Sequence, residues 1–261
     1  ALRRQKNAVI LAHYYQDFEI QDVADFVGDS LDLSRRAQAA DADIIVFCGV
    51  RFMAEVAKIL NPKRTVLLPD ADAGCSLEES CRPDDFRRFR EAHPDHMAIS
   101  YINCSAEVKA LSDIIITSSS AEAILDRLAP DRKIIFSPDK HLGAYLNKKT
   151  GRDMLLWDGA CVVHEEFSDA ALLEARAGQP GAKIAAHPEC PEEVLDIADF
   201  VGSTSKIINY VRETAAETFI IATEPHILHQ IRKEAPGKDV RPAPGVDEIR
   251  AAGSCPCTYC P

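Results

Sequence analysis

The cysteines are the residues of this chain best suited to chemistry, because a thiolate can act as a nucleophile or bind a metal. The chain has nine of them among 261 residues. In an oxidising compartment an odd number leaves one thiol unpaired, whereas the thiols of a cytosolic protein serve metals or catalysis. Cys75 and Cys161 stand 86 residues apart, and Cys255, Cys257 and Cys260 lie close together near the last residue. This spacing is what an internal repeat would produce.

Cys257 and Cys260 form a Cys-x-x-Cys pair, which is typical of a redox dithiol or of half a zinc site. The sequence nearby holds neither a second such pair nor a pair of histidines, which argues against zinc. A reversible disulfide between the two stays open as an interpretation. Cys48, Cys104 and Cys190 lie in or beside apolar runs and are expected to be inert thiols of the core.

An internal repeat organises the sequence. The segment DVADFVGDS, which contains Asp25, returns as DIADFVGST around Asp199 and, more faintly, as ALSDIIITS around Asp113. The three aspartates are 88 and 86 residues apart. Because a fixed period indicates one structural unit used several times, we predict a triplicated unit.

Polar residues recur in the same register around the three aspartates. Twelve residues before each aspartate, at the end of an apolar run, stand His13, Tyr101 and His187. Five residues after each aspartate stand Ser30, Ser118 and Thr204. Each of these hydroxyl residues is expected to cap the helix that follows it.

Short apolar runs alternate with helical patterns in every copy. The first copy predicts strands at residues 8–12, 25–28, 44–48 and 65–69, and helices at residues 20–25, from residue 30, and at residues 51–60. Continuous apolar strands joined by helices imply parallel sheets covered on both faces. We therefore expect an α/β protein of three pseudo-symmetric three-layer domains, residues 1–85, 86–173 and 174–261, around a pseudo-threefold axis.

The repeat gives the polar residues and the cysteines a common setting. Parallel α/β units bind ligands at the carboxyl ends of their strands, where helix amino termini also point. Three units around one axis would share a cavity that favours an anion such as a phosphate or a dicarboxylate. Cys75, Cys161 and one of the last three cysteines take equivalent places. Three converging thiolates suit an iron–sulfur cluster with three protein ligands and one open iron.

Composition excludes several classes of protein. The chain is 46% hydrophobic and 27% charged, as is usual for a globular protein. Its net charge of -11 argues against nucleic acid as a partner and against a basic membrane-binding surface. No apolar stretch is long enough to cross a bilayer, and the first residues do not resemble a secretory leader. We expect a cytoplasmic protein.

The motifs together closely resemble those of bacterial quinolinate synthase. The resemblance runs along nearly the whole chain and rests on ILAHYYQ, DVADFVGDSLDLSRRA, FCGVRFMAE, PDADAGCSL, SAEVKALSD, PDKHLGAYL, GACVVHEEF, AHPECP and VGSTS. It implies three α/β domains around a [4Fe–4S] cluster. It also implies that iminoaspartate condenses with dihydroxyacetone phosphate, with loss of phosphate and water, to give quinolinate for NAD biosynthesis. L-Aspartate oxidase would supply the iminoaspartate.

The resemblance also assigns residues. The cluster ligands would be Cys75, Cys161 and Cys260, the last because it precedes a proline as in the family. The substrate-binding residues would be His13, Ser30, Tyr101, Ile102, Asn103, Ser118, His187, Pro188, Glu189 and Thr204. The match departs from the family at Cys104, where a threonine is common.

The reaction needs groups that move protons near neutrality and a Lewis acid that helps a hydroxyl leave. We expect Tyr15, His187 and Glu189 to move the protons, since His187 and Glu189 flank Pro188 with their side chains on one side of the chain. Two other functions stay open. One is a different iron–sulfur hydro-lyase, and the other is an iron–sulfur carrier or sensor without turnover.

Overall fold

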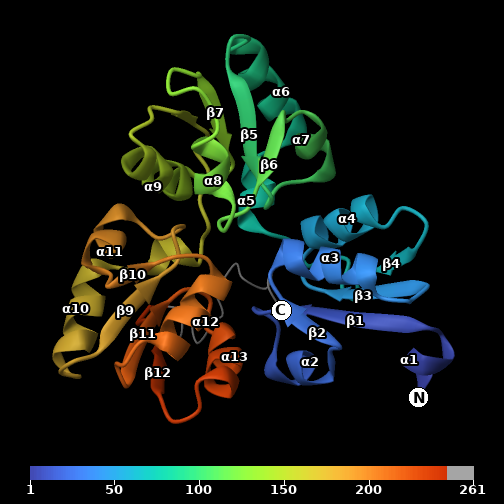
Figure 1. Cartoon of the computed structure of the whole chain (residues 1–261). Coiled ribbons are helices and arrows are strands. Elements are labelled where there is room, and N and C mark those ends of the chain that lie inside the picture. The colour runs from blue at the N-terminus through green and yellow to red at the C-terminus, as the bar shows by residue number, and fades with distance from the viewer. Residues whose placement is uncertain (246–261) are drawn as a thin grey trace. The chain divides into compact units, whose positions relative to one another are not determined.

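A computed structural model describes residues 1–245 of the chain. These residues form two compact units, Ala1–Cys75 and, from Ser76 onward, the remainder. The first unit holds one four-stranded parallel sheet and the second holds two more (Figure 1). The predicted α/β fold with parallel sheets is confirmed. The domain boundaries after residues 85 and 173 stay a prediction.

The strands follow one another in groups of four, one group for each sheet. They are β1 (Ala8–His13), β2 (Phe26–Gly28), β3 (Ile44–Cys48), β4 (Thr65–Leu67), β5 (Met97–Tyr101), β6 (Ile114–Ile116), β7 (Ile134–Ser137), β8 (Leu155–Leu156), β9 (Lys183–Ala186), β10 (Phe200–Val201), β11 (Thr218–Ala222) and β12 (Asp239–Pro242). Their spatial orders are β2-β1-β3-β4, β6-β5-β7-β8 and β10-β9-β11-β12, which is one topology used three times.

The helices repeat with the strands. They are α1 (Leu2–Gln5), α2 (Phe18–Val23), α3 (Ser30–Ala39), α4 (Arg51–Leu60), α5 (Ser76–Ser80), α6 (Pro83–Ala92), α7 (Ala106–Ala110), α8 (Ala121–Leu125), α9 (Lys140–Thr150), the 3-10 turn η1 (His164–Glu166), α10 (Asp169–Ala177), α11 (Glu192–Ile197), α12 (Thr204–Glu213) and α13 (Ile227–Glu234). In each group two consecutive helices pack together, α3 on α4, α8 on α9 and α12 on α13. The predicted helix at residues 51–60 matches α4.

The shared aspartate of the repeat closes the same loop in all three sheets. The Asp25 carboxylate accepts the Ile10 N–H at 2.9 Å, and the Asp25 N–H donates to the Ile10 carbonyl at 2.8 Å. Asp113 makes the same two bonds to Ala98 at 2.7 and 2.8 Å. In the third sheet Asp199 makes both to the strand residue Ile184, each at 2.9 Å. The aspartate therefore fixes the register of the second strand against the first.

Apolar side chains at equivalent places fill the space between sheets and helices. Phe47, Phe136 and Ile221 occupy matching positions on the third strands and are at most 1% exposed. Helix α9 comes so close to its sheet that a Cβ on Gly143 would lie 2.6 Å from a Leu156 methyl carbon and 2.9 Å from the Phe136 ring. Close packing of this kind holds the loops at the strand ends in place.

The predicted helix caps are wrong by one or more residues. Ser30 is the first residue of α3, and the cap is Asp29, whose carboxylate accepts the Asp32 N–H. Thr204 likewise begins α12, one residue after the cap. Ser118 lies in a turn three residues before α8. Asp29 outcompetes the hydroxyl because a carboxylate is also favoured by the helix dipole. The Ser30 and Thr204 hydroxyls thus lie just inside their helices, and Ser118 lies before its helix.

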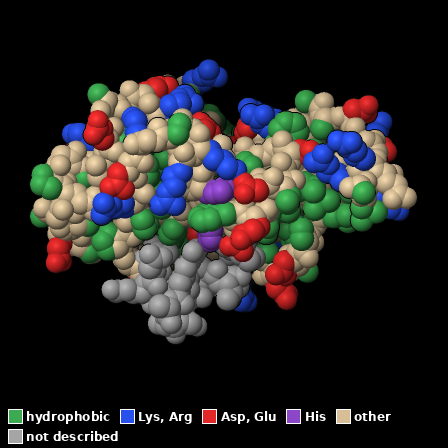
Figure 2. All heavy atoms as spheres, turned by 90° about the horizontal axis from the view of Figure 1, so that it is seen from below, with side chains coloured by type: hydrophobic (Ala, Val, Ile, Leu, Met, Phe, Trp, Pro, Cys, Tyr) green, Lys and Arg blue, Asp and Glu red, His purple; other side chains and the backbone are tan. Residues whose placement is uncertain are grey.

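On the face shown in Figure 2, Lys and Arg side chains are interspersed with Asp and Glu. Among the described residues, exposed charges also form ion pairs, such as Lys148 with Glu192 at 2.8 Å and with Asp196 at 2.7 Å. None of the helices within residues 1–245 is both long and apolar enough to cross a bilayer.

Candidate active site

The predicted site residues of the first unit lie at the carboxyl ends of its strands. His13 is the last residue of β1, and Ser30 follows β2. Both are buried, whereas Tyr15 is half-buried. The Tyr15 N–H donates to His13 Nδ1 at 3.3 Å, so in the neutral imidazole the proton sits on Nε2. The Tyr15 ring meets the His13 ring edge-on with centroids 4.6 Å apart.

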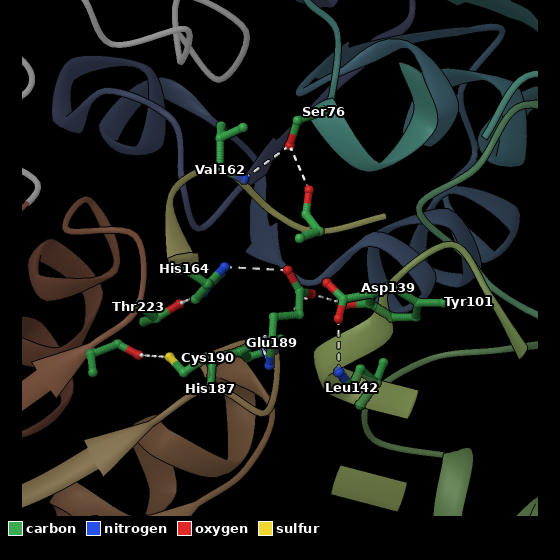
Figure 3. Close-up of polar contacts among 12 residues, drawn as sticks. Ser76, Tyr101, Asp139, Leu142, Val162, His164, His187, Glu189, Cys190 and Thr223 are labelled. Carbon is green, nitrogen blue, oxygen red and sulfur yellow. Dashed lines mark hydrogen bonds and ion pairs between the residues drawn. The ribbon is translucent and has the colours of Figure 1, made fainter. Parts of the chain in front are cut away.

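In the second unit, two predicted residues from different sheets meet. Tyr101 ends β5, and Glu189 follows β9 by three residues. The Tyr101 hydroxyl donates to Glu189 Oε1 at 2.8 Å, although the two residues are 88 positions apart (Figure 3). Both side chains are buried. The strand ends of these two sheets therefore converge on one carboxylate.

Two histidines complete the surroundings of that carboxylate. His187 Nδ1 lies 3.5 Å from Glu189 Oε1 and accepts the Glu189 backbone N–H at 3.4 Å, which confirms that both side chains lie on one side of Pro188. His164 Nδ1 lies 3.2 Å from Glu189 Oε2, and its Nε2 contacts the Thr223 hydroxyl at 2.9 Å (Figure 3). Glu189 thus has polar neighbours on both oxygens.

Burial and these neighbours set the protonation states of the site. Burial lowers the pKa of His187 to about 4, so the ring is neutral at pH 7. Burial by itself raises the pKa of Glu189, whereas the charge that His187 and His164 carry when protonated and the hydrogen bonds from His164 and Tyr101 lower it. The site therefore brings a buried carboxyl group, a phenol hydroxyl and two imidazoles within reach of one another, which are the group types that transfer protons in enzymes.

The loop that carries Cys161 and His164 is held against the middle sheet. The Lys140 N–H donates to the Gly159 carbonyl at 2.8 Å. A Cβ on Gly159 would lie 2.5 Å from the Pro138 carbonyl oxygen, so only glycine allows this approach. The Val162 N–H donates to the Ser76 hydroxyl at 3.2 Å (Figure 3). The loop is thus anchored on both sides of Cys161.

Cys161, His164 and Glu189 bring a sulfur, a nitrogen and an oxygen ligand atom within 4.8 Å of one another. Of the two predicted cluster ligands within the described residues, Cys75 is buried and Cys161 is half-buried. Cysteine thiolates are the usual ligands of iron–sulfur clusters. Cys161 therefore offers the kind of ligand that such a cluster needs, and His164 and Glu189 lie beside it.

The remaining predicted residues lie at the same strand ends. Ile102 and Asn103 directly follow β5, Ser118 follows β6, and Thr204 follows β10. Ile102 and Thr204 are buried, and Asn103 and Ser118 are half-buried. Pro188 is buried between His187 and Glu189. The predicted ligand Cys260, together with Cys255 and Cys257, lies outside the described residues.

Sequence reasoning missed two residues of this site. His164 stands three residues after Cys161, and that Cys-x-x-His spacing was a signal for it. Asp139 is completely buried at the start of α9, close to Tyr101 and Glu189 (Figure 3). Its signal was a carboxyl residue two positions after the third strand, which Glu224 repeats after β11. Glu224 is also buried.

Comparisons with known proteins agree with this geometry. Residues 1–260 match the protein family described as "Quinolinate synthetase A protein". The "Quinolinate synthase" of Synechococcus sp. is 58% identical over 256 residues, which cover 98% of this chain and 80% of that protein. The "Quinolinate synthase" of Microcystis aeruginosa is 55% identical over 260 residues, covering 100% and 80%, and that of Synechocystis sp. is 54% identical over 261 residues, also covering 100% and 80%. This chain belongs to the quinolinate synthetase A family.

Proposed function

We propose that this protein condenses iminoaspartate with dihydroxyacetone phosphate to form quinolinate, with release of phosphate and water. The observation that carries the proposal is the match of residues 1–260 to the quinolinate synthetase family. The site supports it, because the strand ends present a buried base next to a thiol that can bind iron.

We assign the iron–sulfur cluster implied by the family as a [4Fe–4S] cluster held by Cys75, Cys161 and Cys260. With three protein ligands, its fourth iron supplies Lewis-acid chemistry that helps a hydroxyl group leave. The Ser76 hydroxyl accepts the Val162 N–H at 3.2 Å and so holds the loop that carries Cys161.

Glu189, His187 and Tyr15 move the protons of the reaction. Glu189 takes a proton from the substrate as an ionised carboxylate, with Tyr101 fixing its orientation at 2.8 Å. His187 donates a hydrogen bond from Nε2, because its Nδ1 accepts the backbone N–H of Glu189. Tyr15 is held in the same way beside His13 and offers its phenol hydroxyl.

The other strand-end residues bind the charged groups of the substrates. Two carboxylates and one phosphate need hydrogen-bond donors, and backbone N–H groups at helix amino termini supply them together with nearby hydroxyls. The residues we assign to binding are His13, Ser30, Tyr101, Ile102, Asn103, Ser118, His187, Pro188, Glu189 and Thr204. Their places at the strand ends support this assignment.

The substrates also imply a supplier and a compartment. Iminoaspartate forms when the amine of aspartate is oxidised, so L-aspartate oxidase is the proposed source. Thiolate ligands survive best where thiols stay reduced, which favours the cytoplasm. Trapping experiments with the oxidase and cell fractionation test these two points.

The central experiment uses anaerobically prepared, cluster-loaded protein. We expect quinolinate, measured by chromatography, only when both iminoaspartate and dihydroxyacetone phosphate are supplied. Loaded protein that makes no quinolinate contradicts the proposal. Dehydration of another hydroxy acid would instead identify a different hydro-lyase, and transfer of the cluster to apo acceptors without turnover would identify a carrier.

The ligand assignment is tested separately by iron content and by the visible absorbance of the cluster. We expect Cys75→Ser, Cys161→Ser and Cys260→Ser each to lose the cluster, and the buried Cys48→Ser to keep it. A brown, iron-loaded Cys260→Ser protein would move the third ligand to Cys255 or Cys257.

A further inference from the structure

Asp139 is a fully buried carboxyl group without an assigned part in the reaction. It follows β7 and caps the first turn of α9, where its Oδ1 accepts the Leu142 N–H at 2.7 Å. A capping aspartate normally keeps its second oxygen in water. In this structure the second oxygen, Oδ2, is also buried.

No hydrogen-bond donor within the described residues reaches Asp139 Oδ2. The groups that face Asp139 from the neighbouring elements are Tyr101 at the end of β5, Glu189 and Cys190 after β9, and Glu165 in η1. Two of them are carboxylates. Figure 3 shows the Asp139 carboxyl beside the Tyr101–Glu189 pair. An ionised oxygen here would be buried without a donor and next to a second negative charge, which is costly.

The electrostatics agree with this geometry. Burial, followed by the charge of Glu189, raises the pKa of Asp139 well above its usual range, in spite of the N–H groups of Leu142 and His141. Glu189 itself is shifted the other way, to about 2. Pairs of carboxyl groups whose surroundings separate their pKa values in this way divide the roles of acid and base between them.

We propose that Asp139 remains un-ionised during turnover, with its proton on Oδ2, and that it is a positioning residue that keeps the Asp139–Glu189 pair at a single negative charge located on Glu189. This inference rests on the proposed function, in which Glu189 is the base. A second negative charge beside Glu189 would repel substrates that carry carboxylates and a phosphate.

The protonation state of Asp139 should determine how kcat changes at alkaline pH. As the pH rises, the wild-type protein ionises Asp139 and loses activity. Asp139→Asn has no proton to lose, while its amide can still accept the Leu142 N–H and stay neutral toward Glu189. We therefore expect kcat of Asp139→Asn to fall only about threefold near pH 7, and its alkaline limb to move upward by about one pH unit or more.

Ser168→Ala is the matched control. Ser168 caps α10 in the same unit through the Ala171 N–H at 3.3 Å, as Asp139 caps α9, but it lies on the surface. This variant should lower Tm through the lost cap and leave the pH dependence of kcat as in the wild type. A shift of the alkaline limb in both variants would mean that cap loss alone explains it and would overturn the proposal.

The protonation state is read directly by infrared difference spectroscopy at pH 7, wild type minus Asp139→Asn. We expect the carbonyl stretch of one un-ionised carboxyl, which disappears at alkaline pH. A carboxylate band in its place would overturn the proposal, as would an Asp139→Asn protein that fails to fold, since a neutral isostere should fit a site built for a neutral acid. The spectrum needs no turnover, so a failure of the quinolinate assay and a failure of this proposal are distinguishable.

Discussion

The turn after β1 and the turn after β9 have the same backbone and different chemistry. In each, a histidine ends the apolar run, and the N–H of the residue two positions later donates to its Nδ1, at 3.3 Å for His13 and 3.4 Å for His187. The donating residue is Tyr15 in the first turn and Glu189 in the second. The repeat thus copies the histidine and the hydrogen bond to its Nδ1, and the residue two positions later decides which side chain lies beside it.

The middle repeat differs from both outer repeats at this turn. Its equivalent turn begins with Tyr101 instead of a histidine, and the phenol reaches Glu189 of the third repeat at 2.8 Å. The middle repeat thus supports a side chain of the third repeat. The difference between the β1 and β9 turns predicts that variants of the two turns fail in different ways.

The largest effect is expected for Glu189→Gln. The amide keeps the shape of the side chain and can accept from Tyr101, but it cannot take a proton, so we expect kcat to fall by about 10²–10⁴-fold with a much smaller change in KM. Steady-state kinetics of the cluster-loaded protein measure this. Glu192→Gln, an exposed acid three residues further on in α11, is the control and should stay near wild-type activity. Equal loss in both variants would remove Glu189 from the base role.

Acid should destabilise the β9 turn through His187. The folded pKa of His187 is lowered to about 4 by burial, and the unfolded value is 6.5, so the unfolded chain binds the proton first. The contribution is absent above pH 6.5, and stability is lost as the pH falls from 6.5 toward 4, by about 3 kcal/mol in total. Urea unfolding of the apo protein at pH 7.5 and pH 5 should show this loss, reduced in His187→Asn.

The urea-unfolding experiment on His187→Asn has a matched control at another histidine. His93→Asn changes a histidine at the end of α6, away from the strand ends, and should leave the acid-induced loss as in the wild type. If His187→Asn loses as much stability between the two pH values as the wild type does, burial of a neutral His187 is not the cause.

Tyr15→Phe should have a milder effect than Glu189→Gln. The phenylalanine ring keeps its edge-on contact with His13, at 4.6 Å between centroids in the wild type, so only the hydroxyl and its hydrogen bond to the substrate are lost. A lost hydrogen bond of ordinary strength lowers kcat/KM by about tenfold. A drop as large as that of Glu189→Gln would show that the two turns share the proton transfers equally.

Much of this comparison could be predicted from the sequence, because the repeat preserves backbone roles. Asp25 and Asp199 make the same hydrogen bonds to the first strand of their sheet. The apolar runs before His13 and His187 end at the same place in the two sheets. Asp139 and His164 were not predicted, since their roles come from contacts with Glu189 across two sheets. The Cys-x-x-His spacing before His164 and the carboxyl position that Asp139 shares with Glu224 do not show which groups these contacts reach. The prediction that Ser30 caps α3 was wrong for a local reason, because Asp29 competes with Ser30 for the same N–H groups.

The smallest effects are expected for the aspartates that hydrogen-bond to the first strand of their sheet, Asp25 and Asp199. The two outer repeats are alike at this position. Asp199→Asn keeps an acceptor for the Ile184 N–H and loses the ion pair with Lys183 at 2.8 Å, which is partly exposed, so we expect about 0.5 kcal/mol of lost stability. Asp199→Ala leaves the strand N–H without its acceptor and should cost about 1–2 kcal/mol. The same pair of changes at Asp25 should give the same ordering in urea unfolding, because Asp25 accepts the Ile10 N–H at the same distance, 2.9 Å. If the aspartate variants lose stability in only one of the two repeats, the copies have diverged in their backbone as well as in their chemistry.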